Sequence, residues 1–343
     1  MKAYAKSLKR IVQFPTMIFV KIMLQYLIIL LDDASTSYCH YSPSQSQHQL
    51  IGLADLKAGI RFAMKENLMI QYVYPDCDLP QEYKDTIETI DHSKIIPSNS
   101  LLVEDADVVV FNDWKDTIGF SLDESATYVL RINKKDLFAQ KDVIKTFIGK
   151  VTRLNIVITD VETFTEDDFS KYQAILDSFG EETEKLYKAG LSPQLNVITD
   201  RIALSQMNNC NAGSNNITLA PDGRFYVCPA FYYSEEDKES FCVGDLKNGL
   251  AIKVARLYKL AYAPLCRICD AYQCKRCVWI NRKMTYDITT PSHEQCVLAH
   301  LERNASRKVL ESVRKNKEFY PEQDIKEIDY LDPFDVRIDW HKI

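Results

Sequence analysis

The sequence predicts an α/β protein in which a body with a mainly parallel sheet precedes a small cysteine-rich module. Two observations support this prediction. Apolar runs typical of buried strands alternate with helical patterns through residues 23–206. Eight of the 10 cysteines then lie between Cys210 and Cys296. The alternation favours a sheet curved into a partial barrel, and the clustered thiols favour a metal-binding appendage over residues 207–316.

The elements of the body follow one another in order. Buried strands are expected at residues 26–31, 68–73, 107–111, 127–132, 154–159 and 195–199. Helices are expected at residues 53–66, 81–90, 136–150 and 165–188, and Gly190 suits the C-terminal cap of the last one. Asp160 and Asp200 follow strand ends, where α/β proteins place their sites, so each is a candidate substrate ligand or a helix N-cap.

Composition and charge exclude several classes of function. The formal net charge of −6 argues against a general nucleic-acid-binding protein. Only 10 glycines occur, and neither a G-x-G-x-x-G sequence nor a phosphate-binding loop is present. Because metal thiolates survive in a reducing compartment while a secreted disulfide scaffold would be smaller, we expect the protein in the cytoplasm.

The first 31 residues contain an apolar run that resembles a membrane anchor. Lys21 and Gln25 interrupt this run, and its uninterrupted part is too short to span a bilayer. Asp32 and Asp33 follow where a signal peptide would have small residues for cleavage. We therefore expect no membrane role, a buried strand from Tyr26, and an upstream extension over residues 1–22.

The cysteine-rich module contains the stretch C-x2-C-x4-C-x2-C, formed by Cys266, Cys269, Cys274 and Cys277. Two C-x2-C turns can close a tetrahedral thiolate site, which zinc and iron–sulfur clusters both accept. Cys210 and Cys228 flank a hairpin expected over residues 217–227, whose turn is Pro221-Asp222-Gly223. Cys242 follows, a helix is expected at 251–261, and Cys296 lies on a helix expected at 293–315.

The order C-x12-G-x4-C, C-x2-C-x4-C-x2-C and a last cysteine closely resembles the SPASM domain of radical AdoMet enzymes that modify peptides and proteins. The resemblance covers about residues 207–300, and two of its gaps are shorter here by one residue. It implies two auxiliary [4Fe–4S] clusters. Cys210, Cys228 and Cys277 would bind the first, with Cys242 as a candidate fourth ligand. Cys266, Cys269, Cys274 and Cys296 would bind the second; zinc remains the alternative.

The body lacks the AdoMet-binding sequences of that family. Residues 32–49 occupy the place of the C-x3-C-x2-C loop but contain only Cys39, and one thiolate cannot hold the cluster. Tyr74-Pro75-Asp76-Cys77 replaces the glycine-rich turn after the second strand. We therefore expect no AdoMet cofactor. The whole chain is similar to the CXXX repeat peptide maturase group, in its stretches YLIILLDD...SYCHY and AMKENLMIQYVYPD.

These observations leave three functional hypotheses. The first is an auxiliary iron–sulfur protein that binds a ribosomally made cysteine-rich precursor peptide and acts with a separate radical AdoMet enzyme. The second is a zinc-stabilised binding module without catalytic activity. The third is an enzyme that uses Cys39 and His40, for which no third catalytic group is evident. An acidic tail over residues 317–343, with apolar residues alternating from Phe334 to Trp340, would pack on the body or pair with a peptide.

Overall fold

The computed structural model describes residues 24–43, 48–315 and 318–335. The expected extension over residues 1–22 and most of the alternating run from Phe334 to Trp340 lie outside these residues. Within them, a single sheet has the strand order β11-β10-β9-β8-β1-β2-β3-β4-β5-β6-β7. No described helix combines the length and the apolarity needed to cross a membrane.

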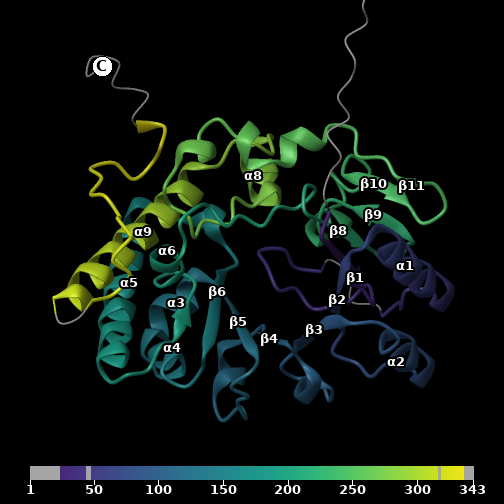
Figure 1. Cartoon of the computed structure of the whole chain (residues 1–343), viewed down its shortest axis with the longest axis horizontal. Helices are drawn as coiled ribbons and strands as arrows, with labels where there is room; N and C mark the ends of the chain where they lie inside the picture. Colours follow the sequence, from purple (N-terminus) through teal and green to yellow (C-terminus); the bar gives the residue numbers. More distant parts are fainter. Residues whose placement is uncertain (1–23, 44–47, 316–317, 336–343) are drawn as a thin grey trace, which may run out of the picture.

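The body of the sheet consists of parallel strands that lie side by side in chain order. They are β1 (Tyr26–Leu30), β2 (Met69–Val73), β3 (His92–Pro97), β4 (Val108–Phe111), β5 (Thr127–Ile132), β6 (Arg153–Ile158) and β7 (Gln194–Leu195). Sequential neighbours of this kind are typical of a barrel, and the strands follow an arc in Figure 1. The predicted α/β fold with a partial barrel is therefore confirmed.

The cysteine-rich module continues the same sheet. Its strands are β8 (Asn216–Leu219), β9 (Arg224–Tyr226), β10 (Cys242–Asp245) and β11 (Gly249–Leu250). β8 runs parallel to β1, with Ile217 opposite Leu27, whereas β8 to β11 pair antiparallel. The predicted hairpin is present, one residue earlier than expected, and Gly223 makes its turn with a φ of 74°. The module is thereby joined to the body by backbone hydrogen bonds.

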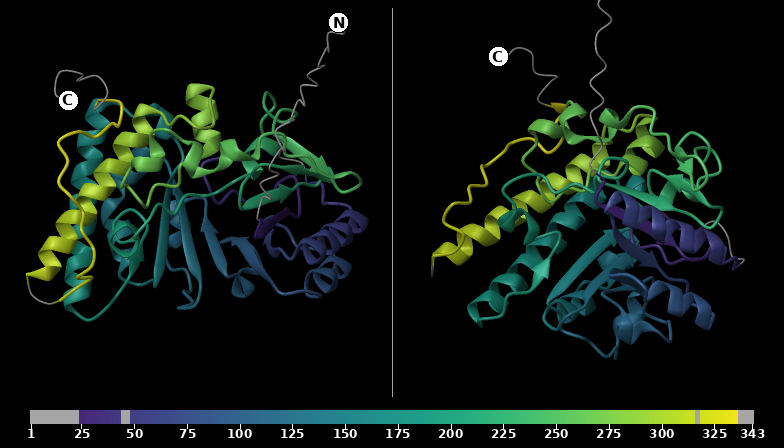
Figure 2. Two further views of the ribbon diagram at one scale, coloured as in Figure 1. Left: turned by 45° about the horizontal axis from the view of Figure 1, so that its top comes forward. Right: turned by 45° about the vertical axis from the view of Figure 1, so that its right-hand side comes forward.

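Helices cover the outer side of the arc, and the longest two lie against each other. The helices of the chain are α1 (Leu53–Glu66), α2 (Gln81–Ile87), α3 (Lys134–Ala139), α4 (Lys141–Ile148), α5 (Glu166–Lys188), α6 (Asp200–Ala203), α7 (Pro229–Tyr232), α8 (Val278–Thr285) and α9 (His293–Arg314). Thr165 and Asp168 form a capping box that begins α5, and Gly190, with a φ of 85°, follows its end. Both views of Figure 2 show α9 beside α5.

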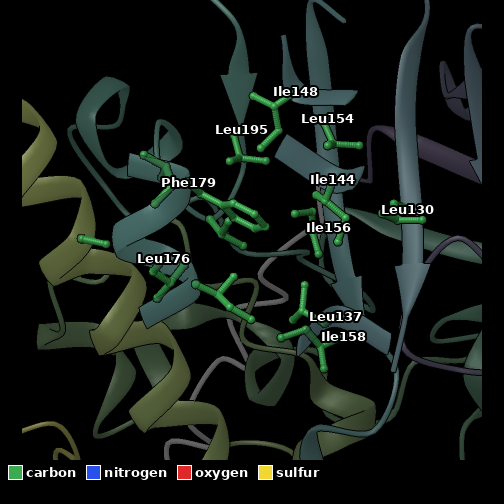
Figure 3. Packing of buried hydrophobic residues seen from close by; sticks show 14 of the residues in the cluster. Leu130, Leu137, Ile144, Ile148, Leu154, Ile156, Ile158, Leu176, Phe179 and Leu195 are labelled. Carbon is green, nitrogen blue, oxygen red and sulfur yellow. The ribbon is translucent and has the colours of Figure 1, made fainter. Parts of the chain in front are cut away.

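Two large apolar clusters fill the space between the sheet and its helices. In the first, Phe179 and Leu176 of α5 face Leu154 and Ile156 of β6, as Figure 3 shows. Residues of α9, among them Leu301 and Val309, belong to that same cluster. The last helix of the cysteine-rich module therefore contributes to the core of the body.

The inner face of the sheet carries a smaller cluster. Ile28, Leu30, Val73 and Val110 form its floor, and tyrosine side chains cover them. These are Tyr41, Tyr226, Tyr232 and Tyr233. Large side chains thus pack on this part of the inner face.

Several predicted elements differ from the structure. Strand β3 was not predicted. Its first half, His92-Ser93-Lys94, is polar, so the buried Ile95 and Ile96 do not form an apolar run long enough to indicate a strand. The helix expected at 136–150 is two helices, interrupted at Gln140. The helix expected at 251–261 consists of two 3₁₀ turns, Ala255–Tyr258 and Leu260–Tyr262, which the extended Lys259 separates.

One further strand, β7, and one further helix, α8, also differ from the prediction. The strand expected at 195–199 ends at Leu195, because the Asn196 side chain takes over the pairing with β6: Ile156 donates to its Oδ1 at 2.8 Å. Helix α8 was not predicted. The described part of the acidic tail packs on α9, where the Arg314 guanidinium donates to the Phe319 and Gln323 carbonyl oxygens at 3.0 and 2.8 Å.

Candidate metal centre

Four cysteines of the module line one enclosed cavity. The cavity, of about 20 Å³, lies between the loop with the two C-x2-C turns and the start of α9. Its walls include the four thiols expected to bind the second cluster, Cys266, Cys269, Cys274 and Cys296. Burial raises the pKa of the Cys266 thiol to about 11, and the nearby Cys269 thiol adds to that rise. Thiols in such surroundings stay protonated at neutral pH until a metal displaces the proton.

Two buried arginines hold this loop in place. Arg303 of α9 is fully buried, and its Nε and Nη2 donate to the two carboxylate oxygens of Asp270 at 2.7 and 2.6 Å. Arg201 of α6 donates from Nε to the Asp270 carbonyl oxygen at 2.6 Å and lies over the Tyr272 ring at 4.3 Å. Burial raises the pKa of Asp270, but both guanidinium groups outweigh burial and hold it below its usual value. The charged pair thereby fixes the residues next to Cys269.

A histidine that the sequence analysis did not select also borders this cavity. His300 lies one helical turn after Cys296, and its Nε2 is 3.3 Å from the Sγ of Cys269. Burial lowers the pKa of His300, which favours a neutral ring that can donate a hydrogen bond to a thiolate. The spacing of four residues on one helix was the available signal.

The four cysteines around this cavity are called the second group of thiols, after the cluster they are expected to bind. The other cysteines of the SPASM-like pattern, Cys210, Cys228 and Cys277, form the first group, next to the sheet. The backbone N–H of Cys210 donates to the Lys275 carbonyl oxygen at 2.9 Å, which ties this segment to the turn before Cys277. Cys228 ends the β8–β9 hairpin and precedes α7. Burial raises the pKa of Cys228, and the adjacent thiols of Cys277 and Cys210 add to the effect. The structure therefore brings these three thiols together, while their role as ligands stays a prediction.

A buried cation lies between the two groups of thiols. Arg276 is 2 % exposed and has a φ of 43°, a left-handed conformation that is uncommon for arginine. Its Nη2 donates to the Tyr258 carbonyl oxygen at 2.5 Å, whereas Nε and Nη1 have no hydrogen-bond partner among the described residues. Burial lowers the pKa of Arg276, and the thiols of Cys266 and Cys210, one from each group, oppose that shift. Its free donors are therefore near both groups.

The thiols and the buried cation fit iron–sulfur clusters. Clusters held by thiolates carry negative charge, which Arg276 would compensate, and hydrogen bonds to their sulfurs are a usual feature. In residues 24–43, 48–315 and 318–335, no three His, Cys, Asp or Glu side chains converge on a site for one metal ion. In a four-iron cluster each thiolate binds a different iron, so the ligands surround a larger group, and the thiols would move apart to admit it.

Cys242 is held by contacts of its own. It lies on β10 opposite Tyr226, and its Sγ is 3.5 Å from the Gly244 carbonyl oxygen. It packs against the same apolar cluster as Cys228. Its assignment as the fourth ligand of the first cluster stays a prediction.

The residues after β1 and β2 do not fit AdoMet. Cys39 is the one cysteine of residues 32–49, and Tyr74, which is buried, begins the turn after β2. Above β1, the Tyr232 hydroxyl donates to the Asp33 carboxylate, and Tyr41 stacks on Tyr233 with 5.6 Å between the ring centroids. The chain lacks the required thiolates, and tyrosines fill the neighbouring space.

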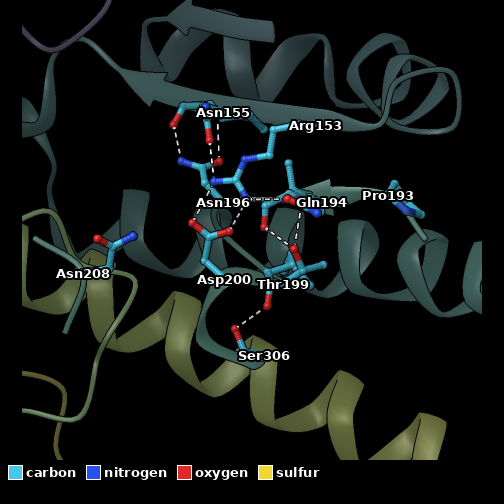
Figure 4. A network of polar contacts seen from close by, with 12 residues as sticks. Arg153, Asn155, Pro193, Gln194, Asn196, Thr199, Asp200, Asn208 and Ser306 are labelled. Atoms are coloured by element: carbon cyan, nitrogen blue, oxygen red, sulfur yellow. Dashed lines mark hydrogen bonds and ion pairs between the residues drawn. The ribbon is translucent and has the colours of Figure 1, made fainter. Parts of the chain in front are cut away.

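The two carboxylates expected at strand ends have structural partners. Asp200 accepts hydrogen bonds from Nη1 and Nη2 of Arg153 at 2.5 and 2.9 Å, in the network of Figure 4. Its neighbour Thr199 bonds back to Leu195, and Ser306 of α9 joins the same region by donating to the Ile198 carbonyl oxygen. Asp160 accepts from the backbone N–H of Lys134 at 2.8 Å and so supports the start of α3. Both contacts explain these carboxylates without a substrate.

Cys39 and His40 are engaged in different contacts. The Nδ1 of His40 donates to the carbonyl oxygen of Ile158, the last residue of β6, at 2.8 Å. Burial raises the pKa of Cys39, and the thiols of Cys210 and Cys277 add to the rise. Neither observation pairs the Cys39 thiol with the His40 ring as nucleophile and base.

Comparison with known proteins identifies the fold. No protein-family model and no curated protein sequence matches the chain. Solved structures of anSMEcpe with bound AdoMet do match. The structure with AdoMet has a TM-score of 0.57 at 11% identity and covers 85% of this chain and 100% of its own. The structure with AdoMet and the Cp18Cys peptide has a TM-score of 0.58, also at 11% identity, covering 85% of this chain and 99% of its own.

Proposed function

We propose that this chain is an auxiliary iron–sulfur protein in the maturation of ribosomally synthesised cysteine-repeat peptides. It would act with a separate radical AdoMet enzyme, because its own barrel lacks the residues for AdoMet. The observation that carries the proposal is the presence of two groups of clustered thiols on a barrel that lacks the residues for AdoMet. The match to anSMEcpe structures, one of them with a bound peptide, supports this reading through the shared fold.

A hollow beside the second group of thiols suits an extended peptide. It has a volume of about 440 Å³, and Cys269, Tyr272, Lys326, Glu327 and Tyr330 are among its lining residues. Volumes of this size accommodate ligands of a few residues, with aromatic side chains for contact and charged ones for orientation. When bound, the clusters would supply electron transfer, and a first cluster with three protein thiolates would also supply an open iron for a peptide thiolate. The chain itself would hold the peptide against Tyr330 and the loop at Cys269.

Peptide binding can be measured directly on the anaerobically reconstituted full chain. The probe is a fluorescent synthetic peptide with cysteine at every fourth position, and its control has serine in place of each cysteine. We expect fluorescence anisotropy to give at least about tenfold tighter binding for the cysteine peptide, equivalent to about 1.4 kcal/mol. Equal affinity for both peptides, or no saturable binding of either, would contradict the proposal.

Two tyrosine variants locate the peptide. Tyr330 lines the hollow, whereas Tyr320, at 46% exposure, lies on the same tail outside it. We expect Y330A to weaken binding of the cysteine peptide by about tenfold or more and Y320A to leave it unchanged, because truncated aromatic anchors often cost about 1–3 kcal/mol. If Y320A weakened peptide binding as much as Y330A or more, the peptide would bind at a surface other than this hollow.

The alternative is a zinc-stabilised module that binds a peptide or protein without taking part in chemistry. The thiol donors accept zinc as well as clusters, and in that case the metal would supply folding energy alone. Metal and sulfide analysis of the purified protein separates this alternative from the first.

A further inference from the structure

The loop after β1 reaches the first group of thiols from the other end of the chain. Its residues Tyr38, Cys39 and Tyr41 contact the same apolar cluster of the inner face as Cys228. Tyr41 stacks on Tyr233, five positions after Cys228. His40, next to Cys39, lines the same cavity of about 90 Å³ as Cys277 and Arg276. Three separate contacts therefore bring this segment to the module.

Firm polar contacts fix Cys39 in this position. Arg131 of β5 donates from Nε to the Cys39 carbonyl oxygen at 2.9 Å and from Nη2 to the Tyr41 carbonyl oxygen at 2.5 Å. Its Nη1 also donates to Asn112 at 2.7 Å, so the guanidinium is oriented from both sides. Together with the bond from His40 to Ile158, these contacts hold residues 39–41 across the ends of β5 and β6.

We propose that Cys39 supplies the fourth thiolate of the first cluster, together with Cys210, Cys228 and Cys277. This assignment rests on the proposed function, since it requires the clusters. Cys39 packs against the same apolar cluster as Cys228, and its neighbour His40 lines the same cavity as Cys277, which agrees with one common site. Arg276 is the second observation. Its guanidinium is buried, two of its nitrogens have no hydrogen-bond partner in residues 24–43, 48–315 and 318–335, and it lines the cavity that His40 and Cys277 share.

The assignment has a consequence for chemistry and for the fold. A cluster with four protein thiolates has no open iron, so it would transfer electrons without binding a peptide thiolate. The second cluster also has four assigned thiolates, so with Cys39 bound neither cluster would coordinate a peptide thiolate, and both would transfer electrons. The first cluster would also tie the loop after β1 to a module more than 170 positions later in the chain.

Three matched serine variants of the full chain test this assignment. C39S removes the proposed ligand, C242S removes the ligand that the SPASM-like pattern suggests, and C77S removes the other cysteine of the body. After anaerobic reconstitution with iron and sulfide, the wild type should contain about eight irons per chain. We expect C39S either to fall to about four irons or to keep a three-thiolate cluster, while C242S and C77S retain the wild-type content and spectrum.

Electron paramagnetic resonance of the reduced protein distinguishes the two outcomes for C39S. A cluster kept by three thiolates has an open iron, so added 2-mercaptoethanol should change the C39S spectrum and leave the wild-type spectrum unchanged. A further measurement uses the wild type alone: Cys39 should resist alkylation by iodoacetamide in the reconstituted protein and react after the iron is removed. This measurement does not depend on the folding of a variant.

The possible failures are distinguishable. If the wild type holds about eight irons and C39S has the same iron content and spectrum, Cys39 is no ligand, and the proposed function stands. If C242S alone changes the first cluster, Cys242 is the fourth ligand. If the wild type holds no iron after reconstitution, the proposed function fails and the assignment of Cys39 fails with it.

Discussion

Replacement of Asp270 by asparagine tests how the fold holds the second group of thiols. Arg303 is 0% exposed, and the Asp270 carboxylate accepts its two hydrogen bonds at 2.7 and 2.6 Å. D270N removes the negative charge and one acceptor while the guanidinium stays buried. Arg303 would keep a buried charge without its full partner, but the Asp270 side chain is 34% exposed, so we expect D270N to lose about 2–3 kcal/mol of its free energy of unfolding.

The assay is urea denaturation of the anaerobically purified protein, followed by tryptophan fluorescence. The matched control is E239Q, which breaks a similar bidentate pair on the surface, between Arg224 and Glu239 at 2.7 Å. Since Glu239 is largely exposed, solvent screens this pair, and E239Q should lose much less stability than D270N. We also expect D270N to retain less iron than E239Q. A loss of stability for D270N no larger than that for E239Q would refute this reasoning.

Two further predictions concern the hairpin of the module and the acidic tail. G244A should destabilise the protein by about 3 kcal/mol, because Gly244 has a φ of 130° and an added Cβ would lie 2.1 Å from the Gly249 oxygen. G249A, at a φ of 78° with no atom within 4 Å of its Cβ, should cost only about 1–2 kcal/mol, and equal thermal unfolding midpoints for the two variants would contradict this. Burial lowers the pKa of His293, but the Asp332 and Glu166 carboxylates raise it by more than burial lowers it. The net shift of the pKa is therefore upward. The charged imidazole therefore holds the tail below about pH 6.5, and this stabilisation is lost as the pH rises through the raised pKa. Hydrogen-exchange protection of residues 318–335 should fall as the pH rises above about 6.5 in the wild type and be low and independent of pH in D332N. Protection that rises with pH would show that the sign is wrong.

Local sequence patterns predicted the elements whose burial is periodic. The spacing of Phe169, Tyr172, Leu176 and Phe179 predicted α5, and all four side chains are buried in one cluster. Strand β3 escaped because only its second half is buried, so it showed neither alternation nor a continuous apolar run. The end of β7 was missed because a side chain, Asn196, replaces the backbone in the pairing with β6.

The candidate metal centre was predictable only where cysteine spacing is local or follows a known pattern. The resemblance to the SPASM domain separated the cysteines into two sets, and the structure brings Cys266, Cys269, Cys274 and Cys296 to one cavity. No spacing relates Cys39 to Cys210, because the long-range pairing of β1 with β8, and not local spacing, brings the loop after β1 to the module. The burial of Arg276 was equally unpredictable from the sequence, since a basic residue between two cysteines usually faces solvent.

Analysis of iron, sulfide and zinc in anaerobically purified protein, with a visible absorption spectrum, tests the central claim most directly. Two four-iron clusters predict about eight irons and about eight sulfides per chain, with a broad thiolate-to-iron absorption that bleaches on reduction. One or two zinc ions per chain, without sulfide and without visible absorption, would contradict the claim and identify the module as a structural zinc site.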